Sequence, residues 1–208
     1  MNRRPDQSGD ARFSVRSFRR QAWIVALLLG GLSGCRPDVT PKPSSFFRIE
    51  PDTAPYVPVD GDPKPLFFEL PASAVVEKDS TQREEAWFNV HFPSYRATLY
   101  CSYHRAHGEE NLWQLLDESR DLVYRHVTKA DEIVAQGYTD TESGLYATLY
   151  LLRGNSATPV QFTITDSSSY LFRGALYFDT PVRPDSVAPV VDYLTGDIIH
   201  LIETFQVR

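Results

Sequence analysis

Hydrophobic and polar positions alternate along much of the chain after residue 66, which is the pattern of β-strands with one buried face. The clearest runs are Trp87–Phe92, Tyr95–Tyr103, Leu145–Leu151, Val160–Ile164 and Tyr170–Phe178. The turn-forming segments between successive runs are short. We therefore expect neighbouring strands to pair as antiparallel hairpins.

Two segments follow helical spacing instead. In the first, apolar residues recur three and four positions apart from Leu112 to Ala130. The second runs from Val187 to Phe205, with Ser186 as its predicted N-cap and Pro189 in its first turn. Each apolar stripe needs a sheet face to cover it. The order strands, helix, strands, helix thus predicts an α+β domain, in which an antiparallel sheet packs against two main helices.

The first residues have the layout of an export signal. The apolar run Ala22–Gly31 follows several arginines and is too short to span a bilayer as a helix, but it suits the apolar region of a signal peptide. It leads into Leu32-Ser33-Gly34-Cys35, which resembles a lipobox. We expect cleavage between Gly34 and Cys35, so that Cys35 becomes a lipidated amino terminus carrying diacylglyceryl and N-acyl groups.

Proline dominates the next segment. Eight prolines occur between Arg36 and Pro65, and proline favours extended chain over helix. We expect residues 35–65 to form a tether, within which Phe46–Ile49 docks on the domain as a short strand. The predicted organisation is a cleaved signal peptide at 1–34, the lipidated tether at 35–65 and a single α+β domain at 66–208.

Charge is unevenly distributed between the signal and the rest. Residues 1–34 carry six arginines and two aspartates, so they contribute +4 to a total of −6, and the mature part carries −10. A chain this acidic is not expected to bind nucleic acid or to be attracted to an anionic membrane surface. The lipid on Cys35 is therefore the predicted membrane attachment.

One cluster has metal-ligand spacing. Cys101, His104 and His107 are three residues apart, and zinc or copper binds cysteine and histidine. If the strand continues through Tyr103, however, Cys101 and His104 point to opposite faces. We therefore predict no metal site, and expect one buried thiol and two exposed histidines. The three residues remain the candidates should the strand break near Ser102.

Enzyme motifs are missing from the sequence. It has no G-x-S-x-G nucleophile elbow, and its 11 glycines form no phosphate-binding loop. We expect His126 to pack against the first helix and His200 to be solvated beside the last helix. The chain is thus predicted to be no enzyme and to hold no cofactor.

Tyrosines and one arginine form a candidate interaction surface. Tyr146 and Tyr150 lie on the face of the Leu145–Leu151 strand opposite its apolar side chains. Arg173 and Tyr177 share one face of the Tyr170–Phe178 strand. If helices cover both faces of the sheet, these side chains are buried. If one face is open, they form a patch of the residue types that protein interfaces favour.

Several motifs together resemble one family, the GldD gliding-motility lipoproteins. They are Asp38–Ile49 after the lipobox, Trp87–Pro93, Leu115–Arg120, His126–Asp131, Phe172–Phe178 and Asp185–Leu194. The resemblance extends over the mature chain, and the two-helix antiparallel arrangement also resembles the PsbP/Mog1-like fold. Membership implies a non-enzymatic envelope lipoprotein, required for gliding motility and linked to the type 9 secretion machinery, whose proteins would be its partners. Of the family's functional positions, only Cys35 carries over.

Two further expectations concern location and an alternative role. Arg36, and not aspartate, follows Cys35, so the inner-membrane retention signal of enteric bacteria is missing and a periplasm-facing position on the outer membrane is favoured over the inner membrane. The alternative role is a periplasmic lipoprotein that binds a small molecule, in a pocket between sheet and helix, or a metal at Cys101, His104 and His107.

Overall fold

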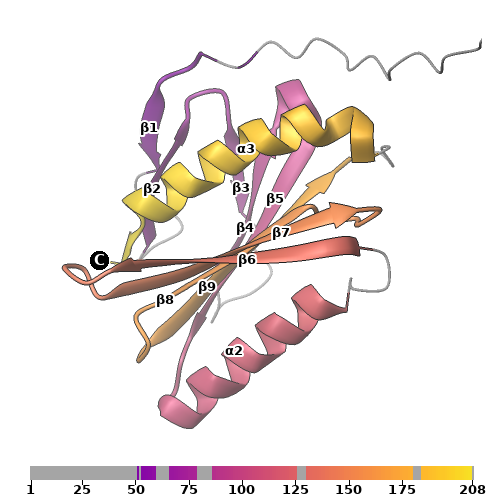
Figure 1. Ribbon diagram of the computed structural model, residues 1–208. Helices are drawn as coiled ribbons and strands as arrows, with labels where there is room; N and C mark the ends of the chain where they lie inside the picture. Colours follow the sequence, from indigo (N-terminus) through magenta and orange to yellow (C-terminus); the bar gives the residue numbers. More distant parts are fainter. Residues whose placement is uncertain are drawn as a thin grey trace, which may run out of the picture. The chain divides into compact units, whose positions relative to one another are not determined.

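The computed structural model describes residues 51, 53–59, 66–78, 86–125, 130–179 and 184–207, all within one compact unit formed by residues 45–208. Figure 1 shows a layered α+β arrangement, in which a strongly twisted sheet lies between two helices. The elements are β1 (Tyr56–Val59), β2 (Leu66–Pro71), β3 (Val75–Lys78), β4 (Ala86–Phe92), a 3-10 turn (Pro93–Tyr95), β5 (Ala97–Arg105), α2 (Glu109–Tyr124), β6 (Ala130–Asp140), β7 (Leu145–Gly154), β8 (Val160–Thr165), β9 (Tyr170–Phe178), α3 (Pro184–Thr204) and β10 (Gln206–Val207).

The larger sheet has the strand order β3-β4-β5-β9-β8-β7-β6, and each neighbouring pair is antiparallel. Strands β4 and β5 pair directly, as do β7, β8 and β9, so the expected antiparallel pairing is confirmed. Near the centre of the sheet, β5 pairs with β9, although the two strands are far apart in the sequence. A smaller sheet, β1-β2-β10, joins the first strands to the end of the chain.

Helix α3 lies across one face of the larger sheet (Figure 1). Buried apolar side chains of α3 and of the strands form a single hydrophobic core there. Phe172 of β9 is fully buried at its centre, with its ring 4.9 Å from that of Phe205 and 5.8 Å from that of Phe88. Gly174, two residues further along β9, leaves room for a third ring, because a Cβ there would lie 2.3 Å from Cε1 of Phe162. Burial of this apolar surface is the main source of the stability of the fold.

Helix α2 lies against the opposite face of the larger sheet (Figure 1). That face carries polar side chains that are nevertheless buried: Thr98, Ser102, Gln161, Thr163 and Thr165. The helix itself buries only Leu112, Ser119 and Val123. The two helices therefore cover faces of different chemistry, although the sequence predicted an apolar stripe on each helix.

The predicted α+β fold, with an antiparallel sheet and two main helices, is confirmed, but some element boundaries are wrong. The first helix ends at Tyr124 instead of continuing to Ala130, which begins β6. The pattern did not predict β6 because this strand lies at the edge of the sheet, where most of its side chains are exposed and need not alternate. Strand β5 begins at Ala97, since Arg96 adopts a left-handed conformation with φ 51°.

The two ends of the domain also differ from expectation. Helix α3 begins at Pro184, so Ser186 is not its N-cap and Pro189 lies inside the helix beyond the first turn. Strand β1 lies within the proline-rich segment 35–65; its Pro58 is tolerated because β1 is an edge strand of the smaller sheet. The predicted signal peptide and Phe46–Ile49 lie outside the described residues.

Candidate functional site

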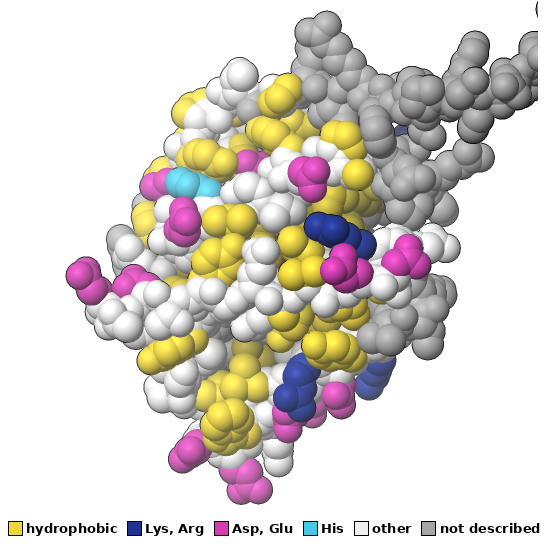
Figure 2. All heavy atoms as spheres, viewed as in Figure 1, with side chains coloured by type: hydrophobic (Ala, Val, Ile, Leu, Met, Phe, Trp, Pro, Cys, Tyr) yellow, Lys and Arg dark blue, Asp and Glu magenta, His cyan; other side chains and the backbone are white. Residues whose placement is uncertain are grey.

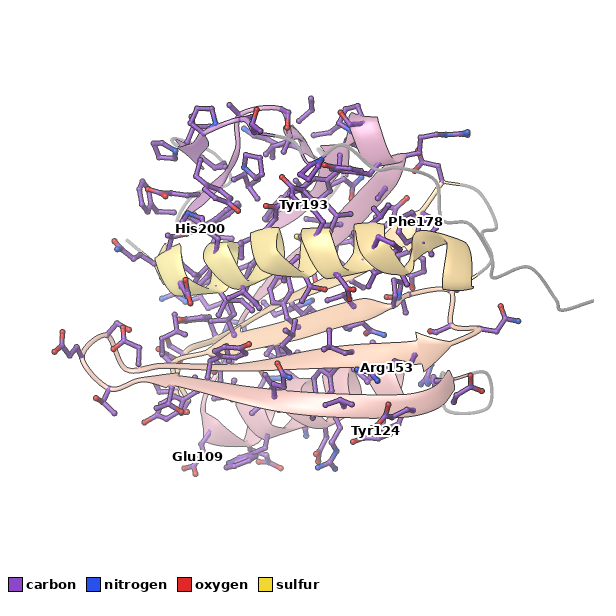
Figure 3. The ribbon with its side chains drawn as sticks, turned by 45° about the horizontal axis from the view of Figure 1, so that its top comes forward. Glu109, Tyr124, Arg153, Phe178, Tyr193 and His200 are labelled. Carbon is purple, nitrogen blue, oxygen red and sulfur yellow. The ribbon has the colours of Figure 1, made fainter. Side chains whose placement is uncertain are left out.

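A cavity of about 960 Å³ lies between α2 and the polar face of the larger sheet. Its volume is at the upper end of the range of small-molecule sites in proteins. Strands β4, β5 and β9 form its floor and α2 forms its roof. Figure 3 labels Glu109 and Tyr124 at the two ends of α2, on the side of the sheet opposite α3.

The roof is one face of α2. Leu115, Glu118, Ser119 and Leu122 line the cavity, and their spacing of three and four residues places them on the same side of the helix. Two of the four are polar, and Glu118 is exposed to solvent. Because these side chains do not fill the space above the sheet, the cavity stays open beneath α2.

A cross-strand row runs through the middle of the floor. Trp87 of β4 lies opposite Ser102 of β5, which lies opposite Arg173 of β9. On one side of this row, the rings of Tyr100 and Tyr177 meet edge to face with centroids 5.5 Å apart. The floor therefore surrounds one cationic group with aromatic and hydroxyl groups.

On the other side of the row lies His104. Its ring meets the edge of Trp87 with centroids 6.3 Å apart, and its Nε2 is 3.1 Å from the hydroxyl oxygen of Ser102. His104 and Trp87 thus extend the aromatic part of the floor beyond Arg173. Both residues line the cavity.

Arg173 is the cation of the cavity. Its side chain is largely buried, and loss of hydration lowers the pKa of the guanidinium, against a smaller raising effect of Tyr177. The ion pairs of the described residues do not include Arg173, and the described residues offer it no hydrogen bond. A buried charge without a partner is costly, so Arg173 is the least compensated group of this face.

The four predicted interaction residues lie on this face but not in one cluster. Arg173 and Tyr177 line the cavity, whereas Tyr146 and Tyr150 lie on β7, with β8 in between. Tyr146 is 44% exposed, and Tyr150 is half-buried near the end of α2. Burial raises the pKa of Tyr150, with a further contribution from Tyr124. Neither of the two expectations, burial of all four beneath a helix or exposure of all four on an open face, is met, because α2 covers only part of the face.

Cys101, His104 and His107 do not converge. Cys101 lies in the apolar core, 4% exposed, and burial raises the pKa of its thiol. His107 lies in the exposed turn before α2, as expected. His104 projects from the other face of the strand and is half-buried beneath α2, so the prediction of two exposed histidines is wrong for this one. Among the described residues, no three His, Cys, Asp or Glu side chains lie close enough to hold a metal ion.

A second polar group links α3 to the smaller sheet and was not predicted. Tyr56 of β1 donates a hydrogen bond of 2.7 Å to buried Asp197, and its ring stacks on His200 with centroids 3.8 Å apart. His200 in turn contacts the carboxylate of Glu69 at 2.9 Å. The prediction that His200 is simply solvated is therefore wrong, because β1 and β2 cover this side of α3 (Figure 3).

The remaining predictions concern parts of the chain that are not described. Gly34 and Cys35, at the predicted cleavage and lipidation site, lie outside the described residues, as does His126. Within the described residues, neither helix combines the length and the apolar character that crossing a bilayer requires.

Comparison with known proteins gives a similarity to solved structures and a family. The solution structure of cyanobacterial PsbP (CyanoP) from Synechocystis sp. PCC 6803 is similar with a TM-score of 0.46 and 10% identity, covering 86% of this chain and 100% of that one. At this score, the similarity supports no conclusion about function. A comparison with curated proteins gave no match.

The family described as gliding motility lipoprotein GldD matches residues 36–207, most of the chain. This confirms the resemblance carried by the sequence motifs. Lipoproteins of this kind are associated with gliding motility and are held at a membrane of the cell envelope. The chain belongs to the GldD family of gliding motility lipoproteins.

Proposed function

We propose that this protein is a non-enzymatic accessory or assembly component of the gliding and type 9 secretion machinery, which it joins by binding envelope proteins. The observation that carries the proposal is the family match, which begins at residue 36, directly after the predicted lipidated Cys35. The matched segment is thus the part of the chain that would follow the lipidated cysteine after signal cleavage.

The proposed anchor is the lipid on Cys35, on the periplasmic side of the outer membrane. Charge would not hold the domain at a membrane, because the chain after residue 34 carries −10. In the view of Figure 2, acidic side chains are scattered over the described surface and no large basic patch lies among them. Several acyl chains would supply the attachment, at about 0.8 kcal/mol per buried methylene.

A binding role is supported by aromatic side chains at the surface. Tyr146 on β7 is 44% exposed and Trp113 on α2 is 60% exposed, and interfaces are enriched in tyrosine and tryptophan. We propose Tyr146, with half-buried Tyr150 four residues further along the same face of β7, as part of the contact surface. Confinement at the membrane raises the effective concentration of both partners, so that a modest affinity suffices.

The test is a crosslinking pull-down from intact envelopes with a tag after Arg208. The expected result is enrichment of motility and secretion components with the wild type and their loss with Cys35→Ala, which cannot be lipidated. If no envelope protein is enriched with either chain, the proposal fails.

A second pair of variants locates the surface. Tyr146→Ala is expected to weaken capture, and Val75→Ala, which shortens an exposed apolar side chain on β3 near the other edge of the larger sheet, is the control. Equal capture by the wild type and both variants would contradict the assignment of Tyr146. It would leave the anchored binding role intact.

A further inference from the structure

We propose that the cavity beneath α2 binds a small organic anion, whose acidic group pairs with Arg173 and whose apolar body lies against Trp87, Leu115 and Leu122. This site is additional to the binding of envelope proteins and does not depend on it. The inference rests on the size of the cavity, on the single uncompensated cation in it and on the division of its lining into polar and apolar parts.

The size favours an organic molecule over a single ion. A volume of about 960 Å³ is far larger than a phosphate or chloride ion requires. Sites of roughly 300–1,000 Å³ usually hold ligands of drug or cofactor size, which touch a mostly apolar wall and a few polar groups. The occupant is therefore expected to have a body of several rings or an equivalent aliphatic chain.

The charge favours an acidic ligand. The guanidinium of Arg173 has lost much of its hydration and finds no carboxylate partner among the described residues. A carboxylate or phosphate group would replace the lost water with charge-assisted hydrogen bonds, and arginine binds both groups through two parallel bonds.

The two acidic residues of the lining do not neutralise Arg173. Glu118 is on the roof and is exposed to solvent. Asp179 follows Arg173 by six residues along β9, roughly 20 Å in an extended strand, and accepts a hydrogen bond from Thr98. The centre of the floor therefore remains positive while the two acidic groups lie towards the periphery.

Polar side chains flank Arg173 on both neighbouring strands; Ser102 lines the cavity, whereas Thr163 and Gln161 lie beyond its lining on β8. Ser102 lies directly opposite on β5 and Thr163 directly opposite on β8, so each β-carbon is about 5 Å from that of Arg173. On β8, Gln161 is 6% exposed, and its amide Nε2 has no partner among the described residues. Buried polar groups are normally paired, so the face is incomplete as it stands.

The apolar body has its own surface. Leu115 and Leu122 of α2 lie one above the other, two helical turns apart, and Trp87 lies across Ser102 from Arg173. A ring placed between them would contact aromatic and aliphatic carbon on both sides. The ligand class that fits is thus amphiphilic, with one acidic group and one aromatic or aliphatic body.

The experiment compares two acids with a neutral molecule of the same shape. The full chain, purified from membranes in a neutral detergent, is titrated calorimetrically with 1-naphthylacetate, with 1-naphthyl phosphate and with 1-naphthaleneacetamide, each against a detergent blank. We expect at least one acid to bind about tenfold to a hundredfold more tightly than the amide, because a charge-assisted hydrogen bond is worth that factor. The tighter acid identifies the acidic group as a carboxylate or a phosphate.

Variants assign the preference to Arg173. Arg173→Met should abolish the difference between acid and amide, and Arg173→Lys should keep part of it. Arg153→Met is the matched control. Arg153 is exposed on β7 (Figure 3) and pairs with Glu132 at 3.4 Å, and it is not among the residues that line the cavity. Each variant is checked for a cooperative thermal transition before titration.

Two results would overturn the proposal. One is a wild type that binds the acids no more tightly than the amide, or binds none of the three. This comparison needs no variant, so a misfolded Arg173→Met chain cannot obscure it. The other is an acid preference that Arg173→Met retains in full, which would place the anion elsewhere on the chain.

Discussion

The two helices that cover the larger sheet differ in how closely they pack against it. On one face, α3 buries Val190, Leu194, Ile198, Leu201 and Ile202 against the sheet and the smaller sheet beside it. On the other, α2 buries three residues, one of which is Ser119, above a floor of hydroxyl, amide and guanidinium groups. The first layer is close-packed, and the second encloses a cavity.

This difference separates stability from binding within one small domain. A packed layer of aromatic and aliphatic side chains supplies most of the free energy of folding. An incompletely packed polar layer gives up part of that free energy, and this loss is typical of sites that must hold something else. The contrast between the faces agrees with the proposed ligand site on the α2 side of the sheet.

The largest expected effect comes from shortening α3 side chains. Leu201→Ala should lower the free energy of unfolding by about 2–5 kcal/mol, because Leu201 is fully buried and its loss leaves a void. Leu115→Ala, the matched change in α2, should cost less than about 1 kcal/mol, since Leu115 is half-buried and already borders open space. Denaturant unfolding of both variants measures the contrast, and equal losses would contradict it.

A glycine on the α3 side provides the next test. Gly174→Ala should destabilise the protein by about 1–3 kcal/mol, since the added methyl would meet Cε1 of Phe162 at 2.3 Å in a close-packed layer. Gly137→Ala in β6 is the control, because a Cβ there meets nothing within 4 Å. Thermal unfolding should distinguish the two, and Phe162→Leu should partly restore Gly174→Ala. A neutral Gly174→Ala would mean that this layer is looser than its geometry indicates.

The third prediction concerns the polar contacts of α3, which are paired, unlike Arg173. Tyr56→Phe removes the hydrogen bond to Asp197 and should cost about 1 kcal/mol, a reduced value for a charge-assisted bond because the Tyr56 ring is 41% exposed. Burial first, and then the hydrogen bond to Asp197 and its negative charge, raise the pKa of Tyr56 from 10 to about 12. Because the pKa of Tyr56 is higher in the folded than in the unfolded protein, the stabilisation by its hydrogen bond is complete below pH 10. It is lost as the pH rises to about 12.

The measurement for Tyr56 is the difference in unfolding free energy between wild type and Tyr56→Phe as a function of pH. The difference should be constant below pH 10 and shrink above it. Tyr146→Phe is the control, because Tyr146 is 44% exposed and has no hydrogen bond among the described residues. A Tyr56→Phe difference that does not change between pH 8 and about 12 would contradict the raised pKa.

The hydrophobic pattern predicted the elements correctly where their side chains are buried against the apolar layer beneath α3. The alternation in β4, β5, β7, β8 and β9 and the stripe of α3 both come from the α3 side, and they predicted the fold class. Strand β6 and the end of α2 were missed because exposed edges and helix ends carry little periodic signal. The family resemblance was available because it rests on short motifs and does not need three-dimensional contacts.

The cavity could be predicted only in part. Arg173 and Tyr177 were identified as sharing one strand face, but Ser102 looks like an ordinary solvent-facing position in an alternating strand. A cavity depends on what the covering helix leaves empty, and the periodicity of α2 does not contain that information. The usable signal was Ser119, a polar residue within an otherwise apolar helical stripe.

The smallest expected effect is the one that most sharpens the contrast between the faces. Arg173→Met should raise the free energy of unfolding of the ligand-free protein by about 0.5–1 kcal/mol, because it removes a largely buried guanidinium that no described carboxylate compensates. Arg153→Met, at an exposed ion pair, should stay within about 0.5 kcal/mol of wild type. Denaturant unfolding measures both. If Arg173→Met instead loses more than about 1 kcal/mol, the guanidinium stabilises the α2 side, and the two faces differ less than their packing indicates.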